Sequence, residues 1–258
     1  ASELVAGVLE VVEDAIKASG SVTAAGVAVN QLNRLNHLDQ LYYAVFEPKA
    51  GYYHWEGNVK RYRLGSNGTV IYDNSATPIN AVDSSTGFFQ KTAKSFWSSA
   101  IDGDIAVEGG MASKLPLPAD RKMFTYMGPL TAKDTALTAI DTSSASFNTA
   151  AKVATGVSGD MYTNLMNWYK GYEVPDLGNG AVPIDSTTVQ RKRIGAALHS
   201  QPLLVNYGYT GDVSAAGNPD NQLNYLFFST LEGALHAVDA KTGIEKFSFI
   251  PGEKLANL

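Results

Sequence analysis

Hydrophobic residues recur with helical spacing at the start of the chain and with strand spacing further on. Residues 2–18 gather apolar side chains on one helical face and acidic ones on the other, which predicts an amphipathic helix docked on a larger body. A helix that binds a separate partner is the alternative. Residues 22–29, 41–46 and 59–64 are rich in β-branched and aromatic side chains and predict strands. The chain is therefore expected to begin with a helix followed by a sheet.

Basic residues are concentrated in the third of these strands. Lys60, Arg61 and Arg63 lie within four positions of one another. Charged side chains on an outer strand deter the addition of further strands, because pairing would remove them from water. We therefore expect residues 59–64 to form an exposed edge of the sheet.

The hydrophobic pattern weakens between residues 65 and 190. Residues 88–99 space their aromatic side chains like one face of a helix, and residues 121–127 predict a strand. Residues 131–159 are rich in Ala, Ser and Thr without a clear period, which favours loops. Residues 159–170 predict a second helix that stops before a glycine. The stretch is too long for a connecting loop and too irregular for repeated sheets, so it is interpreted as an insertion.

A sharp strand pattern returns near the carboxyl end of the chain. Residues 199–208, 224–230, 234–240 and 244–251 each predict a strand, and Gly-containing turns separate the last three. Strands joined in this way form a β-meander, which is the shape of one propeller blade.

Composition narrows the class of protein. Apolar residues make up 45% and aromatic residues 10% of the chain, which excludes disorder for most of its length. The net charge is −5 and no basic run occurs, so nucleic acid is not an expected partner. No apolar run has the length of a membrane span. Charged residues amount to only 17%, so the surface relies on Ser, Thr, Asn and Gly, as in many exported bacterial surface proteins.

Sequence features that would indicate an enzyme are missing. The chain contains no cysteine and none of the common nucleotide-binding, zinc-protease or serine-hydrolase motifs. It has four histidines, His37, His54, His199 and His236, and none has a helical metal-binding spacing. His199 precedes Ser200, but adjacent strand residues point to opposite faces. His236 is expected to be a packed, hydrogen-bonded histidine. No catalytic, cofactor-binding or metal-binding residue is predicted.

One acidic loop is a candidate calcium site. Asp102, Asp104 and Glu108 lie within seven residues of one another, and Gly103 allows a tight turn between the two aspartates. The sequence lacks the complete spacing of an EF-hand loop. A solvated surface loop is therefore favoured over a calcium site.

Several phrases in the chain resemble one protein family. FFSTLEGALHAVDAKTGIEKFSFIP at 227–251 and RIGAALHSQPLLVNYG at 193–208 are the most specific. LYYAVFEPKAGYYHWEGNVKRYRL at 41–64 and the stretch 79–116, which contains NAVDSSTGFF and SFWSSAIDGD, occur upstream in the same order as in the family. Together they resemble the PilY1/PilC family of type IV pilus-tip proteins, over most of residues 35–258.

The chain departs from the family pattern in two places. The family's Gly-Asp-Pro is replaced by Gly195-Ala196-Ala197, and the Asn-Asp of its Thr-Asn-Asp-Gly turn is replaced by Leu231-Glu232. Both changes leave the strand pattern intact, so the expected fold is unaffected. A ligand role for the missing aspartate is in doubt.

The resemblance implies a non-enzymatic protein that supports pilus biogenesis, adhesion and twitching motility. Its implied location is the bacterial surface or pilus tip, associated with the outer membrane, and its implied partners are minor pilins and host or abiotic surfaces. Some members bind calcium through an Asp-rich loop in a later blade, which is not present among these residues. No signal peptide begins at residue 1, so the chain is expected to be either cytosolic or an interior piece of an exported protein, and the resemblance favours the second.

The expected fold is mainly β, a partial modified β-propeller made of four-stranded antiparallel sheets, with a long mixed helix-and-loop insertion. Residues 1–40 would form the amino-terminal helix and a lead-in strand, and residues 41–258 the first portion of the propeller domain. Within that portion, 41–64 would supply strands of the first blade, 65–190 the insertion and 191–258 a clear blade. The length alone would allow about six blades.

An enzyme class remains as the alternative. EGALHAVDAKTGIEKFSF also resembles the blades of quinone-dependent dehydrogenases, which use pyrroloquinoline quinone and usually calcium. Those enzymes repeat the phrase in several blades, whereas it occurs once here. Phe247 also stands where they carry a tryptophan, so this alternative is the weaker one.

Overall fold

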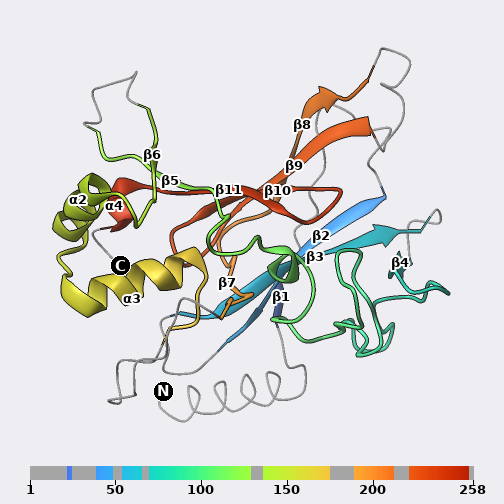
Figure 1. The fold of residues 1–258 in the computed structure, drawn as a ribbon. Helices are drawn as coiled ribbons and strands as arrows, with labels where there is room; N and C mark the ends of the chain where they lie inside the picture. Colours follow the sequence, from blue (N-terminus) through green and yellow to red (C-terminus); the bar gives the residue numbers. More distant parts are fainter. Residues whose placement is uncertain are drawn as a thin grey trace, which may run out of the picture.

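A computed structural model describes most of the chain and shows two β-sheets with helices at one end (Figure 1). The described residues are 22–24 (backbone only), 39–48, 54–65, 70–128, 136–174, 189–211 and 221–255. The predicted helix at 2–18 lies outside them. The prediction of a mainly β chain with antiparallel sheets is confirmed, but the prediction of four strands in each sheet is wrong, because the described sheets have five and six.

The first sheet is built on a long antiparallel pair, β2 (Gln40–Glu47) and β3 (Glu56–Leu64). β1 (Val22–Ala24) pairs with the outer side of β2, while β4 (Ile71–Tyr72) and β7 (Ile194–Gly195) pair with opposite ends of β3. The strands predicted at 41–46 and 59–64 are confirmed. The prediction that 59–64 is an exposed edge is wrong, because β3 has partners on both sides and Lys60 is buried.

The second sheet contains the predicted meander. Its strands are β8 (Leu203–Tyr209), β9 (Gln222–Ser229), β10 (Leu235–Asp239) and β11 (Glu245–Ile250), each antiparallel to the next. β5 (Met123–Thr125) adds to β11 in parallel, and β6 (Thr138–Ala139) pairs with β5. The strand predicted at 121–127 is thus confirmed. Part of the region interpreted as an insertion extends the sheet of the meander.

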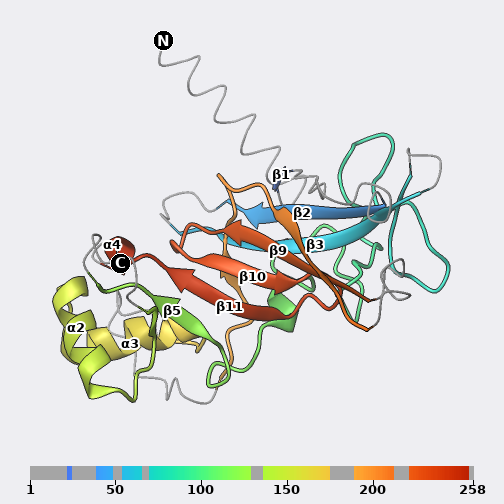
Figure 2. The same ribbon diagram turned by 90° about the horizontal axis from the view of Figure 1, so that it is seen from above.

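The two sheets share a core. Figure 2 shows β2 and β3 running alongside β9, β10 and β11. Alternate residues of β9, Leu226 and Phe228, are buried against Tyr42 and Val59 of the first sheet as parts of one apolar cluster. Burying each of these large side chains contributes about 1.5–3 kcal/mol to folding. The sheets therefore stabilise each other face to face.

Two helices pack at the left-hand end of the second sheet in Figure 1. The helix predicted at 159–170 is confirmed as α3 (Gly159–Lys170), which ends at Gly171 in the left-handed conformation. α2 (Ala145–Thr155) was not predicted, because loops were expected there. The Ser144 hydroxyl caps α2 by accepting from the Phe147 N–H, and Gly156 ends it. Phe147 anchors α2 in the core. Two single-turn elements complete the fold, η1 (Ala112–Lys114) and α4 (Gly252–Leu255).

The helix predicted at 88–99 is absent, so this prediction is wrong. The described chain forms turns and bends there. Two aspartates accept the backbone N–H groups that a helix would use: Asp73 from Lys94 at 3.1 Å and Asp102 from Ser95 at 2.7 Å. Carboxylates that capture backbone donors in this way favour turns over helix. The aromatic periodicity reflects packing, since Phe89 and Trp97 are buried.

Replacing Gly243 by Ala tests how this segment is held to the second sheet. Gly243 has φ +76°, and an added Cβ would lie 2.6 Å from Cγ of Trp97. We expect a loss of about 2–3 kcal/mol from backbone strain plus the clash, measured by urea unfolding. Gly156→Ala is the matched control, because Gly156 has φ +68° and open space around it. Equal losses in the two variants would show that the Trp97 contact contributes nothing.

Candidate functional site

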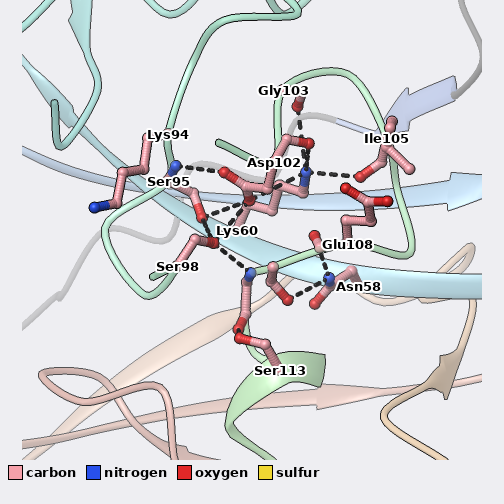
Figure 3. Close-up of polar contacts among 12 residues, drawn as sticks. Asn58, Lys60, Lys94, Ser95, Ser98, Asp102, Gly103, Ile105, Glu108 and Ser113 are labelled. Carbon is pink, nitrogen blue, oxygen red and sulfur yellow. Dashed lines mark hydrogen bonds and ion pairs between the residues drawn. The ribbon is translucent and has the colours of Figure 1, made fainter. Parts of the chain in front are cut away.

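A buried lysine lies at the centre of the first polar cluster (Figure 3). Lys60 on β3 is 1% exposed, and its Nζ donates to the backbone oxygens of Asp102, Gly103 and Ile105 at 2.8, 3.2 and 2.8 Å. Its Nζ is also 3.2 Å from Oδ2 of Asp102. Burial lowers the pKa of Lys60, and the negative charge of Asp102 opposes this effect. The loop oxygens thus replace the water that the ammonium loses.

The Asp102 carboxylate also accepts hydrogen bonds from two serines. Its Oδ1 accepts the Ser95 N–H, and its Oδ2 accepts the hydroxyls of Ser95 and Ser98 at 2.8 and 2.9 Å. Asp102 is 3% exposed, so the expectation of a solvated loop is wrong at this position. Lys60 already supplies the cation that the carboxylate faces. Among the described residues, no group of three His, Cys, Asp or Glu side chains could hold a metal ion.

Asn58 fastens the remainder of the same loop to β3. Its Nδ2 donates to the backbone oxygens of Glu108 and Gly109, and its Oδ1 accepts the Ala112 N–H at 2.9 Å. Gly110 must remain a glycine, because an added Cβ would lie 2.8 Å from both Oδ1 of Asn58 and the Val59 oxygen. The cluster therefore fastens the loop to β3 through several buried hydrogen bonds.

A second charged cluster lies on the sheet that contains the meander, around Glu245 of β11. Glu245 on β11 accepts from Nε and Nη2 of Arg121 at 2.8 and 2.9 Å, and its Oε1 is 2.8 Å from Nδ1 of His236. Although burial raises the pKa of Glu245, the charge of Arg121 and the hydrogen bond to His236 lower it to about 2. His236 is 1% exposed, and its Nε2 lies 3.4 Å from the Thr230 hydroxyl. The prediction of a packed, hydrogen-bonded histidine is confirmed.

Glu232, in the turn between β9 and β10, forms a neighbouring charged group. Its Oε1 lies 3.3 Å from Nε2 of His54 and 3.4 Å from Nη2 of Arg191. Burial raises the pKa of Glu232, but the His54 hydrogen bond and the Arg191 charge lower it to about 2. The Arg191 guanidinium also stacks on Trp168 of α3, 4.1 Å from the ring centre, and donates to the Trp168 oxygen. Glu232 therefore links the meander to the chain just before β3 and, through Arg191, to α3.

A pocket of about 860 Å³ opens beside Glu232, within the size range of small-ligand sites. Its walls come from His54 just before β3, from α3, from the β9–β10 turn with its flanking strand ends and from the chain after β11, and they are mostly apolar. The described lining residues are His54, Leu165, Trp168, Tyr169, Ser229, Thr230, Leu231, Glu232, Gly233, Leu235, Pro251 and Lys254. The sequence analysis did not predict this site. The one sequence feature that pointed toward it is Glu232, which stands where the PilY1/PilC pattern has the aspartate of its Thr-Asn-Asp-Gly turn.

Of the two remaining histidines, only His199 lies among the described residues. His199 is exposed, and the Ser200 hydroxyl accepts the Ser229 N–H at 2.8 Å. His37 lies outside the described residues. The strand predicted from residue 199 begins only at Leu203, so the strand geometry expected for His199 and Ser200 is wrong.

Comparison of the chain with family models, curated proteins and solved structures found no match. In the part of the chain that the structure describes, no helix is long and apolar enough to cross a membrane.

Proposed function

We propose that this chain is the first part of a β-propeller domain in a type IV pilus-tip protein. The observation that carries the proposal is the position of the meander. β8 to β11 form consecutive antiparallel strands on the residues that most resemble the PilY1/PilC family. They pack against β2 and β3, which belong to the other strongly resembling phrase. Face-to-face packing of neighbouring four-stranded sheets is how propeller blades stabilise one another.

The proposed activity is assembly and adhesion without catalysis. The sheets provide a scaffold, and the chain from 70 to 111 is displayed around the first sheet (Figure 1). The Lys60–Asp102 cluster holds that segment in one conformation, which lowers the entropic cost of binding. Minor pilins and host or abiotic surfaces are the proposed partners, and the bacterial surface or pilus tip is the proposed location. Calcium would belong to a later blade, so none of these residues is assigned to it.

Deletion of the encoding gene in its own bacterium tests this proposal. We expect fewer surface pili by electron microscopy, together with reduced adhesion and twitching, and recovery of all three when the wild-type gene is restored. A second deletion in a strain unable to retract pili separates assembly from retraction, because pili return there if the protein acts mainly against retraction. Normal piliation, adhesion and twitching in the first strain would contradict the proposal.

A further inference from the structure

The pocket beside Glu232 has apolar walls that are exposed to solvent. Leu231 in the turn and Leu235 on β10 are 39% and 37% exposed, and Leu165 and Pro251 complete the apolar lining. Exposed apolar side chains gathered in one concave site gain free energy when a ligand covers them. The pocket therefore favours a ligand with an apolar group.

The two charged side chains of the described pocket lining, Glu232 and Lys254, differ in whether they have an opposite partner. Glu232 is the only acid among the described lining residues, and it already pairs with Arg191 and His54. Lys254 of α4 also lines the pocket, with its aliphatic stem next to Gly233, where an added Cβ would lie 3.4 Å from the stem. Lys254 forms no ion pair with any acid among the residues that the structure describes. Arg191 is not part of the described lining and neutralises Glu232, so Lys254 is the charged side chain of that lining without an opposite partner.

The aromatic ring in the wall does not offer a free stacking surface. Arg191 lies over Trp168, and His54 packs edge-on against the same ring at 5.1 Å between centroids. A sugar that stacks on an open tryptophan face is therefore a poor fit. The ring instead holds Arg191 beside Glu232, so the positive charge that a ligand can pair with is that of Lys254.

We propose that this pocket binds a short peptide segment of a partner protein in which a large apolar side chain lies next to a carboxylate. The apolar side chain would cover Leu231 and Leu235, and the carboxylate would pair with Lys254. The pocket is open to solvent on one side and bounded by separate elements, which suits a peptide better than an aliphatic chain that must be enclosed. The inference holds whether or not the chain acts in pilus assembly, because it uses only the pocket.

Calorimetric titration with two blocked peptides tests the proposal. N-acetyl-Leu-Phe-Glu-amide and N-acetyl-Leu-Phe-Gln-amide differ only in the charged group. We expect the Glu peptide to bind about fivefold more tightly, the upper range for an exposed ion pair. Lys254→Met keeps the stem beside Gly233 and should make the two affinities equal. Leu231→Ser should weaken both peptides about tenfold through loss of apolar contact.

Lys91→Met, an exposed lysine on the first sheet's side, is the matched control and should leave both affinities unchanged. Thermal unfolding of each variant by circular dichroism shows whether its fold is intact. Three results would overturn the proposal: no binding of either peptide up to millimolar concentration, equal affinity of the two peptides for the wild type, or an unchanged preference in Lys254→Met. Octanoate serves as a further probe, and if it binds while the peptides do not, the occupant is a free aliphatic acid and the proposal is wrong.

Discussion

Lys60→Met is expected to lower the free energy of unfolding by about 3–5 kcal/mol, the typical cost of removing one partner from a buried ion pair. Methionine retains most of the side-chain volume, so little cavity forms. Because methionine carries no charge, the substitution leaves the Asp102 carboxylate buried without a cation. The backbone oxygens of Asp102, Gly103 and Ile105 also lose their donor. Urea unfolding followed by circular dichroism measures the change.

A double-mutant cycle separates the ion pair from the rest of the cluster. Asp102→Asn keeps the shape of the side chain but removes its charge, and the Lys60→Met/Asp102→Asn variant leaves no unpaired charge. We expect the double variant to lose less stability than the two single losses added together. The exposed Lys91→Met should change stability by less than about 0.5 kcal/mol. Additive losses would mean that Lys60 and Asp102 do not depend on each other.

The role of Lys60 could not be predicted from the sequence, although the strand that carries it could. The β-branched and aromatic residues of β3 predict a strand. They do not reveal that a loop more than forty positions later closes over Lys60 and supplies its acceptors. A charged residue in a strand is usually solvated, so the exposed edge was the reasonable expectation. Burial of a charge depends on partners that only the tertiary fold brings together.

The helices show the same distinction between local and distant causes. α3 was predictable because its apolar spacing and Gly171 lie within the segment itself. The absence of a helix at 88–99 was not predictable, because the carboxylates that take the backbone N–H groups of this segment include Asp73, which lies outside it. The pocket beside Glu232 was equally hidden, since it draws on four separate parts of the chain. Sequence periodicity therefore identified sheets and one helix, while the polar clusters required the fold.

Glu245→Gln is expected to lower the free energy of unfolding at neutral pH by about 3 kcal/mol or more, because it leaves the buried Arg121 without its counter-charge. The same substitution should change the pH dependence of stability. The pKa of Glu245 is lowered from 4.5 to about 2 in the folded chain, so its contribution is complete above pH 4.5 and is lost as the pH falls through 2. This contribution is on the order of 3 kcal/mol.

Urea unfolding of the wild type and Glu245→Gln from pH 7 to pH 2 tests both parts of this prediction. The difference in stability between them should be largest at neutral pH and should shrink in acid, because the wild type loses the Glu245 contribution there and the variant has none to lose. Asp120→Asn, an exposed acid next to Arg121 in the sequence, is the control and should follow the wild type at each pH. A constant difference across the range would show that the Glu245 charge is not what stabilises the fold. Glu232 retains its own lowered pKa in the variant, so some acid sensitivity must remain.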